Sequence, residues 1–330
     1  MYEDLLTLLA SRGLASLAAT ITPLAGGVSS DIYLVEDGDT RFVLKRALPK
    51  LRVKDEWLAD VSRNQYEQAY IDYVAGFLPD AVPRILHRDP EHGFFTMEYL
   101  GDGFANWKKL MLGGVYDYGH ADQAAKILGT IHKRSWNDPK VAERFDTTAN
   151  FIQLRVDPYL YTTGARHPAL KAMFDEEGQR LTETRRCLVH GDYSPKNILI
   201  SPARMVVLDC EVAWFGDPAF DVAFLLNHLV LKSVLLATHP EPVIEMVHHA
   251  WANYQQALGK PLRLPLEPNV TRLLLMLMLA RIDGKSPVEY LSETQRSFVR
   301  DFTTKLLPER PEFLSQVLVK WHRALDRFEG

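Results

Sequence analysis

The segment that most constrains this chain runs over residues 188–200 and reads LVHGDYSPKNILI. It begins and ends with apolar residues typical of buried strands, and the glycine, serine and proline between them predict a loop. Asp192 and Asn197 are therefore expected on one short loop that is held at both ends by strands. Proteins often place the polar groups that act on a ligand on such anchored loops, so this pair predicts a functional site.

The length and charge of the chain indicate its domain organisation and the partners that it is not expected to bind. The chain has 330 residues, which is long for a single core and predicts two domains or lobes. Hydrophobic residues make up 47% and charged residues 24%, as in ordinary globular proteins. The formal net charge of −4 gives no electrostatic reason to expect nucleic acid or an anionic membrane as a partner. We expect the protein to be a monomer or a homodimer.

Cysteine content and apolar runs predict a cytoplasmic protein. Cys187 and Cys210 are too few for a disulfide framework, and both lie in apolar runs, so we expect reduced core residues. The N-terminal segment MYEDLLTLLASRG carries acidic residues where a signal peptide would carry basic ones. The longest apolar run, residues 273–280, is far shorter than the roughly 20 residues that span a bilayer.

Hydrophobic periodicity predicts an α+β lobe at the N-terminal end. Leucines at helical spacing indicate a helix over residues 2–18, and a second helix is expected over 59–76. Strand patterns separated by turn-forming residues follow at five places, residues 21–25, 32–36, 41–46, 84–87 and 93–100.

The rest of the chain is predicted to be mostly helical, apart from two or three short strands within residues 186–209. Helices are expected over residues 121–136, 168–182, 218–237, 241–258, 266–282, 287–306 and 311–326. The polar stretch of residues 101–103 is expected to divide an N-terminal lobe, residues 1–100, from a larger lobe, residues 101–330.

Two features of the N-terminal lobe suit a phosphate group. The turn LAGGVSSDIYLV contains glycines between two strands, whose backbone N–H groups can approach an anion, although a plain hairpin turn is the commoner role. Lys45 lies in the apolar strand RFVLKRAL, either as an edge-strand lysine or as a fixed cation for phosphate. Glu67 on the following helix is its natural partner; the alternative is a solvated Glu67 that pairs with Arg63.

A second loop supplies metal-binding oxygens. Asp209 ends the apolar strand of residues 205–208, and a carboxylate there is costly unless it is solvated, paired or bound to metal. With Asn197 it offers the hard oxygen ligands that suit Mg²⁺, while Asp192 would receive or orient a hydroxyl. Each residue alone more often makes local backbone hydrogen bonds. The order of all these parts matches the template of phosphoryl transfer by protein kinases.

The segments HGDYSPKN, VVLDCE and GDPAFDVA resemble the aminoglycoside phosphotransferase and choline kinase superfamily, which includes methylthioribose kinases. The resemblance covers nearly the whole chain, and its catalytic-loop signature is the specific part. It implies a two-lobed protein-kinase-like fold, with an antiparallel sheet and one helix in the small lobe and a mostly helical large lobe. It also implies the use of ATP, or sometimes GTP, with Mg²⁺ to phosphorylate a hydroxyl of a small molecule.

The resemblance also implies roles for individual residues. Asp192 matches the catalytic aspartate, and Asn197 and Asp209 match catalytic residues that bind metal. His190 is expected to order the loop, and Asp221 resembles a buried aspartate that hydrogen-bonds the loop from below. The nucleotide-binding positions implied by the resemblance are Gly26, Gly27, Ser29, Ser30, Lys45, Glu67 and the hinge residues Met97, Glu98, Tyr99 and Leu100.

Motifs that differ from those of protein kinases indicate which class of acceptor the protein would phosphorylate. The chain has HGD for HRD and DCE for DFG, and no Ala-Pro-Glu segment follows, which disfavours a protein substrate. The basic C-terminal helix LVKWHRALDRFEG disfavours a polycationic antibiotic, so a neutral polyol or sugar-like acceptor is preferred, with an amino alcohol or an aminoglycoside-like molecule as the other classes. Candidate acceptor contacts are Tyr193 and Trp214 near the loop and Arg281 and Asp283 at the end of an apolar helix.

These patterns predict an ATP- and Mg²⁺-dependent kinase that phosphorylates a hydroxyl of a small molecule. The alternative is a pseudokinase, in which the same fold binds nucleotide or a partner without transfer. A pure binding module has no need of Asp192, so its presence favours the enzyme.

Overall fold

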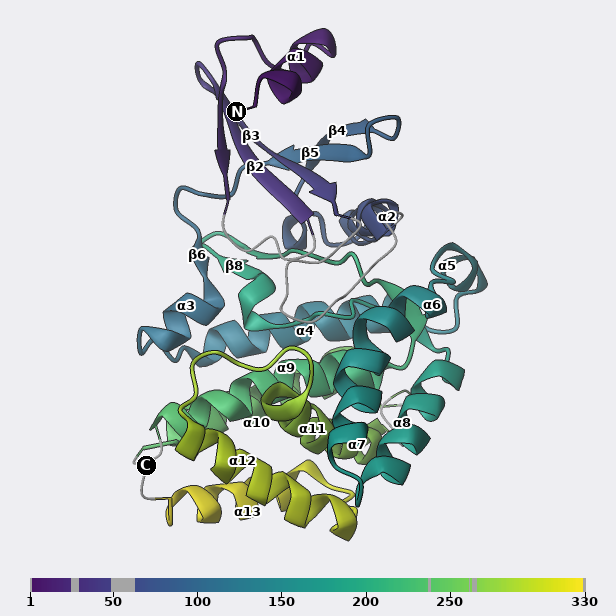
Figure 1. Ribbon diagram of the computed structural model, residues 1–330, viewed down its shortest axis with the longest axis vertical. Helices are drawn as coiled ribbons and strands as arrows, with labels where there is room; N and C mark the ends of the chain where they lie inside the picture. Colours follow the sequence, from purple (N-terminus) through teal and green to yellow (C-terminus); the bar gives the residue numbers. More distant parts are fainter. Residues whose placement is uncertain are drawn as a thin grey trace. The chain divides into compact units, whose positions relative to one another are not determined.

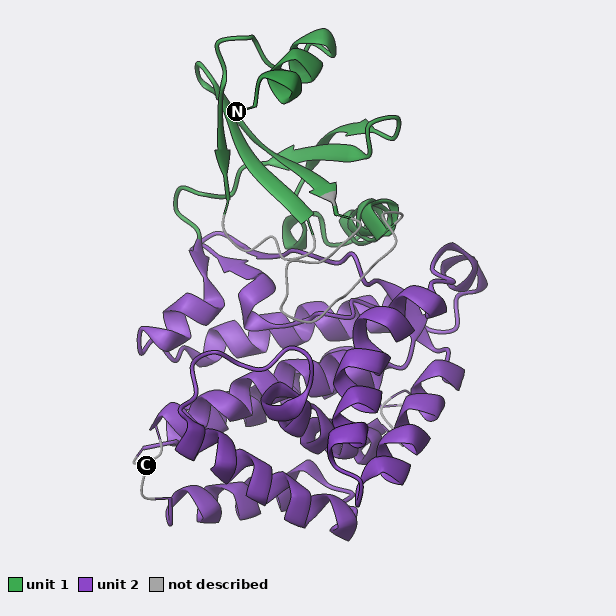
Figure 2. Cartoon of the chain, viewed as in Figure 1, with its two compact units in different colours: residues 1–104 green, residues 105–330 purple. Residues whose placement is uncertain are grey.

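The computed structural model describes residues 2–24, 30–48, 63–236, 239–260, 262 and 266–328. The chain divides into two compact units, Met1–Phe104 (unit 1) and Ala105–Gly330 (unit 2), coloured separately in Figure 2. The division lies four residues after the boundary predicted from the polar stretch of residues 101–103.

Unit 1 contains the predicted antiparallel sheet. Its strands are β1 (Thr20–Pro23), β2 (Ser30–Asp37), β3 (Thr40–Ala47), β4 (Ile85–Asp89) and β5 (Phe94–Glu98), in the order β1-β2-β3-β5-β4. The β2–β3 hairpin forms because two strand-forming runs flank Gly38, whose φ of 59° suits a tight turn. β3 lies between β2 and β5, so its residues 42–46 are paired on both sides; Lys45 lies opposite Ile32 on β2 and Phe95 on β5.

Two helices accompany the sheet. Helix α1 (Glu3–Ser11) is shorter than the predicted 2–18, because the chain leaves the helix at Gly13, where φ is 67°. Its Leu9 packs with Val35, Phe42 and Phe94 of the sheet in one apolar cluster. Helix α2 (Arg63–Ala75) carries Glu67; the predicted residues 59–62 of this helix lie outside the described part of the chain. A short 3₁₀ turn, η1, covers Pro79–Ala81.

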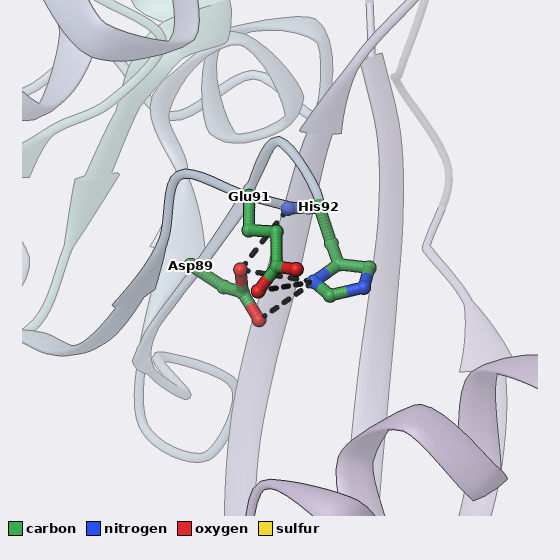
Figure 3. A group of neighbouring side chains, drawn as sticks. All are labelled: Asp89, Glu91 and His92. Atoms are coloured by element: carbon green, nitrogen blue, oxygen red, sulfur yellow. Dashed lines mark hydrogen bonds and ion pairs between the residues drawn. The ribbon is translucent and has the colours of Figure 1, made fainter.

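The β4–β5 turn is tied to the segment that follows α1. Figure 3 shows Asp89, Glu91 and His92 converging in this turn, an arrangement of ligand types that can hold a metal ion. A cation from the chain itself is already there. Arg12 Nε lies 3.0 Å from Asp89 Oδ2, and Arg12 contacts Glu91 and His92 through its terminal nitrogen. We therefore assign this group a structural role.

Unit 2 has two small sheets. Strands β6 (Ala105–Asn106), β8 (Ile198–Ile200) and β9 (Met205–Val207) form a three-stranded sheet, and β7 (Cys187–Val189) pairs with β10 (Trp214–Gly216). All five strands are short, so packing against helices, and not the sheets alone, must stabilise them.

The remainder of unit 2 is helical. Its elements are α3 (Trp107–Leu112), α4 (Tyr118–Arg134), α5 (Pro139–Arg144), α6 (Thr148–Phe151), η2 (Ile152–Tyr161), α7 (Thr162–Arg166), α8 (Lys171–Glu183), η3 (Pro195–Asn197), α9 (Pro218–Ser233), η4 (Val234–Leu236), α10 (Glu241–Leu258), α11 (Leu266–Asp283), α12 (Glu293–Leu306), η5 (Leu307–Glu309) and α13 (Leu314–Leu325). Within this unit α10 packs against α4 and α9, and α11 packs against α9 and α12 (Figure 1).

Helix α9 is the centre of this unit, and every one of its residues is buried. Residues Pro218–Leu236 are long and apolar enough to cross a membrane, but 89% of that window is buried inside the protein. Burial by neighbouring helices explains an apolar character on all sides of a helix.

The short helices α3 and α5 were not predicted, and two longer helical segments of unit 2 also differ from the sequence prediction. Helix α12 begins at Glu293 and not at residue 287, because Ser292 and Gln295 form a capping box there and Pro287 precedes it. The helical stretch from α6 to α7, residues 148–166, was not predicted. Its middle is the π-helical η2 with Pro158 inside, and such wide turns do not repeat apolar residues at the α-helical spacing.

Candidate active site

The loop of residues 190–197 joins β7 to β8 and lies beside the end of β9. In the β8–β9 register Ile198 faces Val207, and Leu208 N donates to Asn197 O at 2.8 Å. This pairing brings Asn197 and Asp209 to the same end of the small sheet. Asn197 Nδ2 donates to Asp192 O at 3.0 Å, which fixes both residues of the predicted pair on one rigid loop.

Asp221 supports this loop from α9. Its side chain is fully buried; Oδ2 accepts from His190 N at 2.6 Å and Oδ1 accepts from Gly191 N at 2.9 Å. His132 Nε2 on α4 lies 3.3 Å from Oδ2. The contact expected of Asp221 from the family resemblance is therefore present. A buried carboxylate with three donors holds the backbone in one conformation, because moving it would leave those donors without an acceptor.

His190 links the two loops through its ring. Nδ1 accepts from Asp192 N at 3.1 Å, so Nε2 carries the hydrogen and donates to Leu208 O at 3.1 Å. Burial lowers the pKa of His190 against the opposing effect of nearby carboxylates such as Asp221, which keeps the ring neutral near pH 7. Both ring nitrogens thus bond backbone groups of the two loops, which is the ordering role expected of His190.

Gly191 is required by the backbone of the loop. Its φ is 79°, and an added Cβ would lie 2.9 Å from the side chain and carbonyl of Val212. We expect Gly191→Ala to lower the free energy of unfolding by about 2–4 kcal/mol through backbone strain and overpacking. Urea denaturation measures this change.

Gly38→Ala is the matched control for Gly191→Ala. Gly38 also has positive φ, 59°, but an added Cβ there meets nothing within 4 Å. Its replacement is expected to cost only the backbone strain, about 1 kcal/mol. Equal losses of stability in the two variants would contradict the close approach of Gly191 to Val212.

Two cations keep Asp192 charged. Lys196 Nζ lies 2.9 Å from Asp192 Oδ2, and the Arg155 guanidinium lies 3.3 Å from the same oxygen. Burial alone would raise the pKa of the Asp192 carboxyl, but Lys196 and Arg155 together hold this pKa below its usual value. The carboxylate is thus ionised near neutral pH and is available to orient a hydroxyl group.

Arg155 and Lys196 are site residues that the sequence analysis missed. Lys196 adjoins Asn197 in the motif SPKN, so its position alone was a signal. Arg155 lies on η2, far from the loop in sequence, and also donates to Gly191 O and Leu154 O. No local pattern marks it, because the helical segment that carries it was itself not predicted.

The donors at this end of the sheet fit a divalent cation of the magnesium type. Asn197 uses its amide nitrogen on Asp192 O, so its amide oxygen is the atom that it can offer to a ligand. Asp209 has a φ of 63°, a left-handed conformation that turns the chain sharply after β9. Glu211, two residues on, is a buried carboxylate. Carboxylate and amide oxygens are the ligands that Mg²⁺ prefers.

In unit 1 the structure contains the predicted Lys45–Glu67 pair. Lys45 Nζ lies 2.8 Å from Glu67, and both side chains are almost fully buried. Glu67 is only 2% exposed, so the alternative of a solvated Glu67 does not apply. A lysine held by a carboxylate on β3 presents a fixed ammonium group.

The other predicted nucleotide-binding positions are described only in part. Gly26, Gly27 and Ser29 lie outside the described residues, and Ser30 is buried at the start of β2. Met97 and Glu98 end β5, where Glu98 N donates to Arg84 O, and Tyr99 and Leu100 follow. The role of these residues in binding a nucleotide stays a prediction.

Burial argues against two of the predicted acceptor contacts. Tyr193 is fully buried, and its hydroxyl donates to Ala124 O at 2.7 Å. Trp214 is fully buried, stacks on Phe151 at 4.1 Å between ring centroids and donates to Thr148 Oγ1. Both side chains are thus committed to the core of unit 2, and we do not propose them as acceptor contacts.

Arg281 and Asp283 differ in what they contact. Asp283 receives two hydrogen bonds from Arg300, both 2.8 Å long, and one from His167, so it ties α12 and α7 to α11. These bonds give Asp283 a structural role. Arg281 is buried and points inward, where it contacts Ser286 and lies 3.4 Å from the Tyr159 hydroxyl.

An antiparallel five-stranded unit with a buried lysine–glutamate pair, followed by a helical unit with an aspartate–asparagine loop, is the arrangement of a protein-kinase-like fold. Residues 20–258 match the phosphotransferase enzyme family, APH, and the chain belongs to that family. The superfamily and the fold class predicted from the sequence are thereby confirmed.

Similar proteins lie within this group. Methylthioribose kinase 1 of Oryza sativa subsp. japonica is 27% identical over 253 residues, which cover 65% of this chain and 56% of that protein. The methylthioribose kinase of Pectobacterium atrosepticum is 24% identical over 240 residues, 64% of this chain and 60% of that protein. The chain thus matches less than two thirds of the length of these curated relatives.

A solved structure supports the fold. An amicoumacin kinase in complex with AMP-PNP and Ca²⁺ is 14% identical, with a TM-score of 0.54 and with 89% of this chain and 90% of that chain covered.

Proposed function

We propose that this protein is an ATP- and Mg²⁺-dependent kinase that transfers a phosphoryl group to a hydroxyl of a small molecule. One arrangement of residues supports this function above the others: the ionised, buried Asp192 shares a rigid loop with Asn197, beside Asp209. The methylthioribose kinase relatives favour a sugar-like acceptor. GTP is the alternative phosphoryl donor.

Asp192 would act on the acceptor. Its carboxylate accepts a hydrogen bond from the acceptor hydroxyl and aligns that oxygen with the γ-phosphorus. A new O–P bond then forms, the bond from phosphorus to the nucleoside diphosphate breaks, and the hydroxyl proton passes to Asp192. Because the pKa of Asp192 is lowered, the carboxylate is a weak base, and positioning contributes more to the rate than early proton removal.

The remaining residues would bind and neutralise the phosphates. Asn197 and Asp209 offer oxygens to Mg²⁺, and Lys45, fixed by Glu67, offers an ammonium group. Bound magnesium supplies charge neutralisation on the transferred group. Lys196, next to Asp192, adds a positive charge on the side of the reacting oxygen. Fixed charges of this kind stabilise a transition state because they need no reorganisation.

A direct test is an ATP-consumption screen of the full chain over sugars, amino alcohols, nucleosides and aminoglycosides. The proposed function requires acceptor-dependent ADP formation and a phosphorylated product visible by mass spectrometry. Nucleotide binding with no acceptor-dependent turnover would instead support a nucleotide-binding module without transfer.

Asp209→Ala tests the metal assignment. We expect this variant to lose Mg²⁺-dependent nucleotide binding while its fold persists, because the site loses its charged ligand next to β9. Calorimetric titration with AMP-PNP, with and without Mg²⁺, measures the loss. Asp175→Ala, which removes an exposed carboxylate of α8 that pairs with Lys171, is the control and should bind as the parent does. Parent-like Mg²⁺ dependence in Asp209→Ala would remove the assignment.

A further inference from the structure

A group of positive side chains is buried in unit 2 with little negative charge to balance it. Lys232 on α9 is 1% exposed, and its ammonium donates to His228 O at 2.9 Å. It lies 5.2 Å from the ring of Tyr290, and Lys108 lies 5.8 Å from the same ring. Arg281 on α11 completes the group. We call Lys108, Lys232 and Arg281, with His228 and Tyr290, the basic cluster.

The charges of the basic cluster are not neutralised by the chain. Lys108 pairs with Glu289, which is the acidic side chain that acts on Lys232. In the described residues His228 Nε2, Arg281 Nε and the Tyr290 hydroxyl are buried and have no hydrogen-bond partner. Folding does not normally bury cations and donors in this state, because an unpaired polar group costs about 1–3 kcal/mol. Such groups point to a missing ligand.

The basic cluster is contiguous with Asp192. Arg155, which contacts Asp192, lies within 6 Å of the rings of Tyr159 and Phe224. Arg281 lies 3.4 Å from the Tyr159 hydroxyl on the other side. The ring of Phe224 is 5.1 Å from that of His228, between centroids. A continuous path of contacts thus leads from the catalytic loop into the cluster.

One edge of the cluster reaches the surface. Lys108 is about a quarter exposed and Glu289 is mostly exposed, whereas Lys232, His228 and Arg281 lie deeper. The loop between α11 and α12, residues 284–292, carries Glu289 and Tyr290. A small molecule that enters between Lys108 and this loop would meet the buried cations.

We propose that the acceptor carries an anionic group, a carboxylate or a phosphate, that binds Lys232 and Arg281 while its hydroxyl meets Asp192. This inference rests on the proposed function. An anion would supply the negative charge that the cluster lacks and would accept hydrogen bonds from its unpartnered donors. A cationic acceptor would meet like charges there. The proposed acceptor, a hydroxyl-bearing acid or phosphate ester, differs from the neutral acceptor expected from the sequence.

The ionisation of Lys232 agrees with this geometry. Burial, together with Lys108 and Arg281, lowers the pKa of Lys232 to about 7, and Glu289 opposes the shift only in part. Tyr290 and His228 also lie next to Lys232. Burial lowers the pKa of His228 as well, together with Arg281, Lys232, Lys196 and Lys108. A bound anion favours the charged ammonium group, so binding at about pH 8 should take up a proton.

Matched pairs of probes test the proposal on the full chain saturated with Mg²⁺ and AMP-PNP. The pairs are gluconate with sorbitol, and ribose 5-phosphate with ribose; glucosamine serves as the cationic probe. Calorimetric titration should show at least one anion binding at least about 30-fold more tightly than its neutral partner. The two pairs distinguish a carboxylate from a phosphate ligand. Titration in buffers of different ionisation enthalpy measures the proton uptake.

Two variants test whether Lys232 and Arg281 bind the anionic group. Lys232→Met keeps most of the aliphatic side chain and removes its charge, and Arg281→Met removes the guanidinium group on α11. Each should lower the preference for the anion at least about 30-fold and leave AMP-PNP affinity unchanged. Lys171→Met, at an exposed lysine on α8, is the control for net charge and should keep the preference. No preference for either anion in the parent, or a preference that survives both substitutions, would overturn the proposal.

Transfer assays separate this proposal from the proposed function. Anion binding that depends on Lys232, without transfer to any acceptor, would remove the kinase function and leave an anion site. Transfer to neutral acceptors with equal kcat/KM in the parent and in Lys232→Met would leave the kinase function and remove the anion proposal.

Discussion

Replacing Asp192 by Asn is expected to lower the rate of phosphoryl transfer about 10³-fold, because an amide can neither hold a negative charge next to the hydroxyl nor accept its proton. Asn has the shape of Asp, so the loop should keep its fold through Asp221 and Asn197. Single-turnover measurements at saturating acceptor and nucleotide report the chemical step. The screen described above must first supply the acceptor.

Nucleotide binding separates this effect from a damaged fold. Asp192→Asn should bind Mg²⁺ and AMP-PNP as the parent does, and Asp175→Asn on the surface of α8 should leave the rate unchanged. The parent rate should also show no loss due to Asp192 protonation at mildly acidic pH, because Lys196 and Arg155 hold the pKa of this carboxyl below its usual value against the effect of burial. A rate within a few-fold of the parent in Asp192→Asn would remove Asp192 from the mechanism.

The fold of unit 1 was predictable because local pattern and tertiary structure agree there. Each of its five strands has a strand-like apolar pattern, and turn residues separate them. Long amphipathic or apolar helices such as α10 and α11 were predictable for the same reason. The stretch of residues 148–166 was not predictable, since Pro158 and the wide π-helical turns of η2 disrupt the α-helical spacing.

The catalytic loop was predictable from a compact motif, but its surroundings were not. Asp192 and Asn197 lie within one loop, so the sequence alone places them together. Arg155 reaches the loop from another helix, and only the tertiary structure brings it there. Tyr193 was assigned to the acceptor because it adjoins Asp192, yet it is buried while its neighbour contacts two cations. Neighbours in an extended loop point to opposite sides.

The burial of Lys232 in the basic cluster was also not predictable from the local sequence. Lys232 stands in the sequence FLLNHLVLKS, where a lysine after an apolar run suggests the solvated end of a helix. The structure buries it, because η4 continues the helix and Lys108 and Tyr290 close over it. A buried charge without a carboxylate partner is visible only once the packing is known, and it is the packing that makes Lys232 informative about the ligand.

The largest loss of stability is expected from Asp221→Leu. The substitution keeps a similar volume but leaves the backbone N–H groups of His190 and Gly191 and the ring of His132 without their acceptor. Leaving buried, polarised donors unpaired should lower the free energy of unfolding by about 3–5 kcal/mol. Urea denaturation followed by circular dichroism, which reports mainly on the helices of unit 2, measures this change.

Asn227→Leu provides the matched comparison, because it makes the same replacement at a fully buried position of the same helix. Asn227 donates only to Phe224 O within α9, and its side-chain oxygen is buried without a hydrogen-bond partner among the described residues. Its replacement removes an unsatisfied atom together with one hydrogen bond, so the change should stay within about 1 kcal/mol. Similar losses in both variants would mean that α9 merely resists substitution, whereas a large loss confined to Asp221→Leu would mean that this one carboxylate fixes the catalytic loop.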